Sequence, residues 1–230
     1  MLSVNDLEVR YGKVRALRGV HLTVPDGGSV AILGPNGAGK TSLLRAISGT
    51  VRPAAGKIVW DGQDVAGRPA FRIVRAGLAH VPEGRAVIAP LSVHENLLMG
   101  AYAAKGRGTD ERLEQMLELF PALRRRLKIA SGRLSGGEQQ MLAIARGLMS
   151  HPRLIAIDEP SMGLAPAVAD VVLEGLRRVH ELGTAVVLVE QNAALALRMA
   201  QDVVLLSHGE VQRSGPATEL ADDVMAHYAD

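Results

Sequence analysis

The stretch GPNGAGKTS, residues 34–42, directly follows the apolar run VAIL of residues 30–33. It fits the spacing G-x-x-x-x-G-K-[ST], in which a bare backbone lets successive N–H groups curl around a phosphate. The helix expected after it points its positive N-terminal end at the same anion. We therefore predict a nucleoside-triphosphate site formed by Gly34, Pro35, Asn36, Gly37, Ala38, Gly39, Lys40, Thr41 and Ser42. Lys40 would reach the β and γ phosphates, and Thr41 would offer a hydroxyl to Mg²⁺.

Composition excludes several other kinds of site. The chain has 230 residues, of which 47% are hydrophobic, so it has enough apolar material for one compact domain. A formal charge of +2 and 3% aromatic residues provide neither a basic field nor stacking platforms, so we expect no nucleic-acid partner. There is no cysteine, which excludes disulfides and thiolate metal sites. The N-terminus does not resemble a signal peptide, and no apolar run reaches the ~20 residues of a membrane span, so any span would come from another chain.

The rest of the chain alternates between two patterns. Buried-strand patterns at 30–33, 154–157 and 185–189 are separated by helix patterns at 42–48, at 137–149 and around 172–179. Further strands are predicted at 4–9, 20–24 and 58–62. This alternation indicates an α/β fold with a mostly parallel sheet.

Residues from about 84 to 133 differ from this pattern and predict a helical insert in the α/β core. A helix begins near Asp110 and places apolar side chains at helical spacing, namely Leu113, Met116, Leu117 and Phe120. We interpret the basic run at 124–128 as a solvated helical face rather than an anion site.

A pair of carboxylates, Asp158 and Glu159, ends the buried strand of LIAIDEP. Ligands of open α/β sheets lie at the carboxyl ends of the strands. Asp158 is therefore a candidate Mg²⁺ ligand, and Glu159 a candidate general base for an attacking water.

A second glycine-rich helix start is present in LSGGEQQ, residues 134–140. Ser135 with Glu138 matches a capping box, and the N–H groups of the same turn also form an anion receptor. One nucleotide has no evident use for both receptors within a monomer.

GPNGAGKT, LSGGEQQ and LIAIDEP, in this order, resemble the nucleotide-binding subunit of an ABC transporter over essentially the whole chain. The resemblance implies one domain, 1–230, with a P-loop NTPase core, an N-terminal antiparallel β subdomain and the helical subdomain at about 84–133. It also implies that two such domains pair head to tail around ATP and Mg²⁺. The partner's ATP would then be bound by Ser135, Gly136, Gly137 and Glu138.

The resemblance assigns further roles and shows two departures from the family pattern. Tyr11 matches the aromatic residue that stacks on adenine. Glu83 stands where most members have Gln; as an oxygen ligand it joins Thr41 and Asp158 as a candidate metal contact. Gln191 stands where most members have a catalytic His, so hydrolysis is expected to be slower or to need the partner.

These departures resemble one branch of the family. VPEGR, VEQN and SMGLAP are similar to the second ATPase of branched-chain amino-acid importers. The expected protein is a peripheral ATPase on the cytoplasmic face of the membrane, which drives permease subunits and depends indirectly on a solute-binding protein. Because of Gln191, we favour a heterodimer with a second ATPase subunit over a homodimer.

Three alternatives remain open from the sequence. A related importer of urea or short amides has similar motifs. A soluble ABC ATPase acting on nucleic acid or ribosomes usually has two ATPase halves or long coiled-coil inserts. A P-loop kinase would leave LSGGEQQ without a role.

His80 and His151 are interpreted as structural or surface residues rather than metal ligands.

Overall fold

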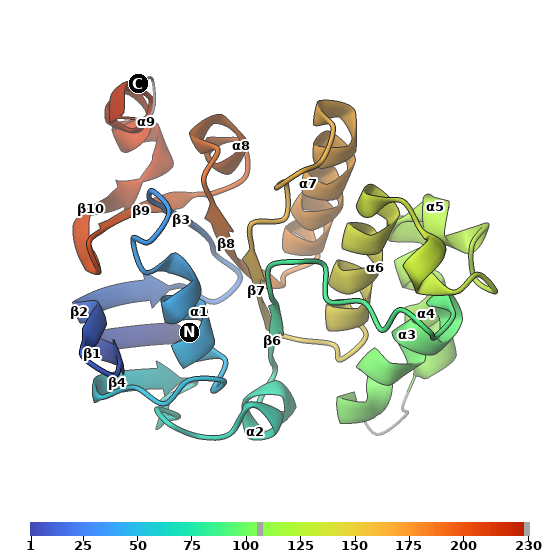
Figure 1. Cartoon of the computed structure of the whole chain (residues 1–230), viewed down its shortest axis with the longest axis horizontal. Coiled ribbons are helices and arrows are strands. Elements are labelled where there is room, and N and C mark those ends of the chain that lie inside the picture. The colour runs from blue at the N-terminus through green and yellow to red at the C-terminus, as the bar shows by residue number, and fades with distance from the viewer. Residues whose placement is uncertain (105–107, 228–230) are drawn as a thin grey trace.

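The computed structural model describes residues 1–104 and 108–227, which form two sheets with helices around them (Figure 1). The smaller sheet is antiparallel, in the order β2-β1-β4-β5. Its strands are β1 (Leu2–Tyr11), β2 (Val14–Val24), β4 (Ala55–Trp60) and β5 (Gln63–Asp64). This sheet is the predicted antiparallel β unit near the N-terminus.

The larger sheet has six strands in the order β10-β9-β3-β8-β7-β6. All neighbouring pairs are parallel except β9 with β10, which confirms the predicted α/β core. Its strands are β3 (Ser29–Leu33), β6 (Leu78–Val81), β7 (Leu154–Asp158), β8 (Ala185–Glu190), β9 (Asp202–Ser207) and β10 (Glu210–Pro216). Strands β3, β7 and β8 end where the sequence places the phosphate loop, the two carboxylates and Gln191.

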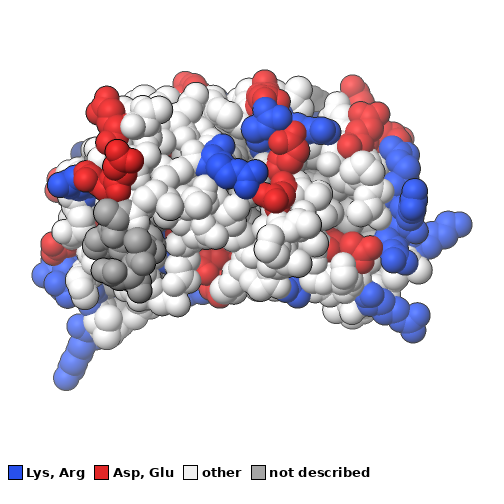
Figure 2. Space-filling view, turned by 90° about the horizontal axis from the view of Figure 1, so that it is seen from above, with Lys and Arg blue, Asp and Glu red and all other residues white. Residues whose placement is uncertain are grey.

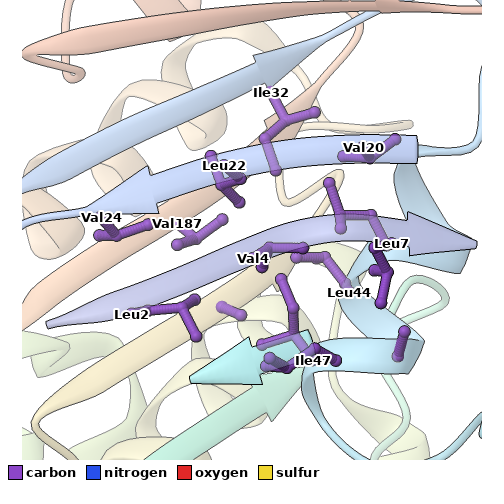
Figure 3. Packing of buried hydrophobic residues seen from close by; sticks show 14 of the residues in the cluster. Leu2, Val4, Leu7, Val20, Leu22, Val24, Ile32, Leu44, Ile47 and Val187 are labelled. Atoms are coloured by element: carbon purple, nitrogen blue, oxygen red, sulfur yellow. The ribbon is translucent and has the colours of Figure 1, made fainter. Parts of the chain in front are cut away.

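A first hydrophobic core fills the space between the two sheets (Figure 3). Helix α1 (Lys40–Ile47) lies there and contributes Leu44 and Ile47. They pack with Val4 of β1 and Val187 of β8. Because α1 is wedged between two sheets, the phosphate loop that leads into it is held from both sides.

A second core lies on the other face of the larger sheet. Successive residues of β7 alternate between the cores: Ala156 faces the first, and Ile155 and Ile157 face the second. The helices over this face gather away from the antiparallel sheet in Figure 1. Those with residues in the second core are α3 (Val93–Ala101), α4 (Thr109–Leu119), α5 (Pro121–Arg124), α6 (Gly136–Leu148) and α7 (Pro166–Glu181).

The remaining helices are short or lie at the edges. Helix α2 (Ala70–Arg75) precedes β6, while α8 (Ala193–Leu197) and α9 (Ala217–His227) cover a third apolar cluster beside β3 and β9. Two short 3₁₀ segments lie at Tyr102–Ala104 and Ser131–Arg133. No helix within the described residues is long and apolar enough to span a membrane.

Several predicted boundaries shift in the structure. Helix α1 begins at Lys40 rather than 42, and β2 begins at Val14 rather than 20, because the early residues of β2 mostly face solvent and lack an apolar pattern. The basic run at 124–128 is exposed as expected, apart from a half-buried Leu127, but it is not helical beyond Arg124. Arg124 and Arg126 form ion pairs with Glu114 and Glu138 instead.

Candidate functional site

Two glycines of the phosphate loop are required because neighbouring backbone packs closely against them. A Cβ on Gly34 would lie 2.2 Å from the carbonyl oxygen of Leu206 in β9. Gly39 has a φ of 109°, and a Cβ there would lie 2.7 Å from the carbonyl oxygen of Ala16. Both positions therefore require glycine, and the loop backbone is pressed against β2 and β9.

Lys40 is buried at the centre of this loop. Its side chain is 4% exposed, and its Nζ donates to the carbonyl oxygen of Gly34 at 2.7 Å and to that of Pro35 at 3.3 Å. The same Nζ lies 3.3 Å from Oε1 of Glu159. The structure thus brings the predicted lysine and the predicted general base into direct contact.

Asp158, the last residue of β7, is a buried carboxylate that lacks hydrogen-bond partners. It is 1% exposed, and neither of its carboxylate oxygens has a partner among the described residues. Burial raises the pKa of Asp158, and the nearby Thr41 hydroxyl opposes that rise. A buried and unsatisfied carboxylate of this kind fits a cation, since leaving such a group without a partner is costly.

Glu159 follows Asp158 in an unusual backbone conformation. Its φ of 47° is in the left-handed region, which a non-glycine residue adopts only when its surroundings hold it there. Its N–H donates to the carbonyl oxygen of Val189 in β8 at 2.9 Å. The carboxylate is therefore aimed at Lys40 by a constrained turn.

A cavity of about 500 Å³ lies along the phosphate loop, and both Lys40 and Glu159 line it. Among the predicted site residues, it is lined by Asn36, Gly37, Ala38, Gly39, Lys40, Thr41, Ser42, Glu83 and Glu159. Tyr11 does not line it, but lies at the end of β1, 41% exposed and paired with Val14, which does. Gly34, Pro35, Asp158 and Gln191 do not line it either.

Gln191 lines a second cavity of about 450 Å³ that shares Glu159 with the first. Ser161 and Glu190 also line this second cavity. The predicted catalytic pair, Glu159 and Gln191, therefore lines one cavity, and only Glu159 also lines the cavity of the phosphate loop.

The second glycine-rich segment forms its own helix start, and its residues line neither cavity. The predicted capping box is present: the Ser135 hydroxyl accepts the N–H of Glu138, and the Glu138 carboxylate accepts the N–H of Ser135. A Cβ on Gly137 would lie 2.2 Å from Cγ1 of Val168 in α7. Gly137 therefore lets α6 pack closely on the helix that follows Glu159.

Three residues of the site were not found by sequence reasoning. A Cβ on Gly136 would come within 2.8 Å of the guanidinium of Arg85, so Arg85 lies over the start of α6. Arg18 and His208 line the first cavity from β2 and from the turn after β9. The available signal was the basic character of VRALR, residues 14–18, and the arginine of VPEGR.

The two histidines singled out earlier have structural positions. Burial and nearby Arg45 lower the pKa of His80 to about 4, so this imidazole is neutral at physiological pH. His151 is exposed in the turn before Pro152. Within the described residues, no group of three or more His, Asp or Glu is arranged to hold a metal ion.

A phosphate loop, a buried strand-end carboxylate pair and a second glycine-rich helix start define a nucleotide-binding P-loop protein. The family model described as ABC transporter matches residues 17–162. The chain belongs to the ABC transporter family, as an ATP-binding cassette with ATPase activity.

Two curated relatives align over nearly the whole chain. The high-affinity branched-chain amino acid transport ATP-binding protein BraG of Pseudomonas aeruginosa is 42% identical, over 92% of this chain and 91% of its own length. The probable branched-chain amino acid transport ATP-binding protein LivF of Archaeoglobus fulgidus is 33% identical, over 96% of this chain and 94% of its own length.

Solved structures have the same fold. An ATP-binding subunit of an ABC transporter aligns with a TM-score of 0.87 and 28% identity, over 100% of both chains. A dimeric ATP-binding cassette in a post-hydrolysis state, bound to ADP and Pi, aligns with a TM-score of 0.84 and 25% identity, over 94% of this chain and 99% of that chain.

Proposed function

We propose that this chain is the ATP-hydrolysing subunit of an importer for branched-chain amino acids. The observation that carries this proposal is its 42% identity with BraG, a branched-chain amino acid transport ATP-binding protein, over nearly the full length of both chains. The departures at Glu83 and Gln191, which resemble this branch of the family, support the same assignment.

ATP would bind at the first cavity, with its phosphates in the loop of residues 34–42. Lys40 is the cation placed there, and its present acceptors are backbone carbonyl oxygens and Glu159. A phosphate oxygen is a stronger acceptor than a carbonyl oxygen, so Lys40 would turn from the loop backbone to the nucleotide.

The residues in and beside this cavity fit Mg²⁺. Proteins usually hold this ion with one or two carboxylates together with substrate phosphates, so a complete cage of protein ligands is not needed. Asp158 has two oxygens without partners, and Thr41 lies beside it; Glu83 lines the cavity as a further oxygen donor. When bound, the ion would neutralise charge on the transferred phosphoryl group.

Glu159 would act as the general base. Its carboxylate contacts Lys40, and its constrained backbone fixes where an attacking water is polarised. The proton of that water would move to the Glu159 carboxylate as the terminal phosphate is released. Gln191, which lines the second cavity together with Glu159, can donate its side-chain N–H to a phosphate oxygen but carries no charge.

The second anion receptor is explained by dimerisation around ATP. Ser135, Gly136 and Gly137 would contact the nucleotide held by the partner subunit, and Glu138 would hold their turn in shape. We favour a heterodimer, because a sister subunit with histidine in place of Gln191 would provide the stronger catalytic site.

An apolar groove of about 410 Å³ supports a membrane partner. It runs between α2, β6, α3 and α6, and its walls include Phe71, Met99 and Tyr102, which are 57%, 55% and 81% exposed. We propose that a short helix of a permease subunit docks in this groove, which places the chain at the cytoplasmic face of the membrane. A solute-binding protein would act on it only through the permease.

Where Figure 2 shows the surface, acidic and basic side chains are interspersed, a pattern that does not favour nucleic acid as the partner.

Turnover by Glu159→Gln tests the ATPase mechanism. We expect ATP affinity within about twofold of the unsubstituted chain and a loss of hydrolysis on the order of 100-fold or more. The control is Glu118→Gln, which changes an exposed glutamate of α4 and should hydrolyse ATP normally. Undiminished hydrolysis by Glu159→Gln would remove Glu159 from this role.

Uptake by reconstituted membranes tests the transport assignment. The chain should co-purify with detergent-solubilised permease subunits, and vesicles containing the complex should accumulate leucine, isoleucine or valine when supplied with ATP. Met99→Glu should weaken co-purification, whereas Leu182→Glu, at an 86% exposed position outside the groove, should not. Accumulation of urea or short amides instead would reassign the substrate, and recovery only with ribosomes or DNA would contradict the importer.

A further inference from the structure

Glu190 is a buried carboxylate to which the mechanism above gives no role. It ends β8, is 2% exposed and precedes Gln191. Its strand pairs with β3, so Glu190 lies opposite Leu33, the residue before the phosphate loop. Burying a carboxylate costs free energy unless hydrogen bonds stabilise it.

The two oxygens of Glu190 hold two different loops. Oε1 accepts the backbone N–H of Ser161 at 3.1 Å, and Oε2 accepts the backbone N–H of Gln191 at 3.3 Å. Ser161 is two residues after Glu159. One side chain therefore fastens the turn of the general base to the turn of Gln191.

The turn that Glu190 holds is the strained one. Glu159 has its φ at 47°, and such a conformation persists only where several contacts fix it. One of these contacts is the hydrogen bond from the Glu159 N–H to the carbonyl oxygen of Val189. The bond from the Ser161 N–H to Glu190 is another, and it fixes the far end of the same turn.

An ionised carboxylate is suited to this position, whereas the isosteric amide is not. The backbone N–H groups of Ser161 and Gln191 donate to different oxygens of Glu190, and a carboxylate offers an acceptor oxygen to each. Glutamine has a single acceptor oxygen, and its NH₂ group would face the second N–H. Burial raises the pKa of Glu190, and the hydrogen bonds from Ser161, Asn192 and Gln191 oppose that rise.

We propose that Glu190 is a positioning residue for ATP hydrolysis, which holds Glu159 and Gln191 in a fixed relation across their shared cavity. This inference rests on the proposed function, since it needs Glu159 as the base. Glu190 would act on Glu159 through the backbone of the turn rather than on the nucleotide or the water. It acts by keeping the general base at the reacting distance, where a displacement of about 1 Å lowers the rate by up to about 100-fold.

Glu190→Gln is the main test, with steady-state ATPase kinetics of the purified chain and its partner subunits. We expect kcat to fall about 10-fold to 100-fold and KM for ATP to stay within about twofold, because the phosphate loop is untouched. Glu210→Gln, an exposed glutamate at the start of β10, is the matched control and should keep the normal kcat. An unchanged kcat for Glu190→Gln would overturn the inference.

The double variant Glu159→Gln/Glu190→Gln separates positioning from a general structural role. If Glu190 acts through Glu159, the second substitution should change the residual turnover of Glu159→Gln less than about twofold. A further 10-fold loss in the double variant would show that Glu190 acts independently and would contradict the proposal. If Glu159→Gln alone keeps full activity, the proposed function has failed; if it is inactive while Glu190→Gln is normal, only this inference has failed.

Amide exchange in the unsubstituted protein provides a test that does not depend on a variant folding. The N–H groups of Ser161 and Gln191 should exchange slowly with solvent deuterium, as bonded amides do. Exchange of both at the rate of freely exposed amides would overturn the proposal.

Discussion

The two glycine-rich helix starts of this chain use their backbone N–H groups in different ways. Helix α1 begins after Gly39, no side chain caps it, and its first turn contains no acidic residue. Helix α6 begins after Ser135 and is closed by a capping box in which Ser135 and Glu138 satisfy each other's N–H groups. At the first start, the positive end of the helix dipole has no side-chain cap and can bind an anion. At the second start, the Glu138 carboxylate already occupies that position.

The charged side chains at the two helix starts also favour an anion at the first start rather than at the second. Lys40 is buried within the first, whereas at the second Arg126 forms an ion pair with Glu138. In the proposed function, the first start therefore holds a triphosphate within one chain. The second is stable by itself and, in our account, gains its ligand only when a partner brings a nucleotide to it.

The largest expected effect is at the first start. Lys40→Ala should weaken ATP binding by about 100-fold, because a charged hydrogen bond to phosphate contributes on the order of 3 kcal/mol. Titration calorimetry with ATP measures this, with the exposed Lys57→Ala as control. If Lys40→Ala bound ATP normally, the first start would not be the triphosphate receptor.

Asp158→Asn should affect catalysis and stability in opposite directions, so it separates the two roles of this carboxylate. Turnover should fall on the order of 100-fold, since a metal contact is weakened. Burial raises the pKa of Asp158, so its ionised form destabilises the folded state, and this cost is present above the raised pKa. The melting temperature at pH 7 should therefore rise in Asp158→Asn. A fall would show that the carboxylate is held by contacts within the folded chain.

A pair of capping variants tests the second start. Ser135→Ala and Ser92→Ala each remove the same kind of capping box, from α6 and α3 respectively. Both should lose about 1 kcal/mol of unfolding free energy, measured by denaturant titration. Only Ser135→Ala should also lower ATP turnover, by about 10-fold, with ATP affinity of the isolated chain unchanged. Equal turnover in the two variants would reduce the second start to an ordinary helix cap.

A smaller effect is expected at Tyr11, which pairs with Val14 at the wall of the first cavity. Tyr11→Ala should weaken ATP binding by about fivefold, since stacking of one aromatic ring contributes about 1 kcal/mol. Tyr11→Phe keeps the ring and should bind as before. Unchanged affinity in Tyr11→Ala, measured by calorimetry, would leave Tyr11 as a residue that only packs at the strand end.

The contrast between the two starts was partly predictable from the sequence. The glycines, Lys40 and the Ser135–Glu138 spacing are local patterns, and each encodes a local backbone geometry. The strand ends at Asp158 and Glu190 follow from short apolar runs that the larger sheet buries on both faces.

The contacts between distant segments were not predictable. Arg85 over Gly136 and Glu190 between Ser161 and Gln191 depend on how loops from different strands meet. No sequence periodicity predicts contacts between loops that are far apart in the chain, and an isolated Arg or Glu in a polar loop looks like a surface residue. The start of β2 was missed for a related reason, since its early residues mostly face solvent and leave no apolar alternation.

The oligomeric state of Glu159→Gln with ATP and Mg²⁺ shows whether the second helix start completes a partner's nucleotide site. With its companion ATPase subunit present and turnover blocked, sedimentation should show a nucleotide-dependent dimer, and adding Ser135→Ala should weaken that dimer. A protein that remains monomeric under these conditions, while still binding ATP, would contradict the claim that the second helix start completes a partner's site.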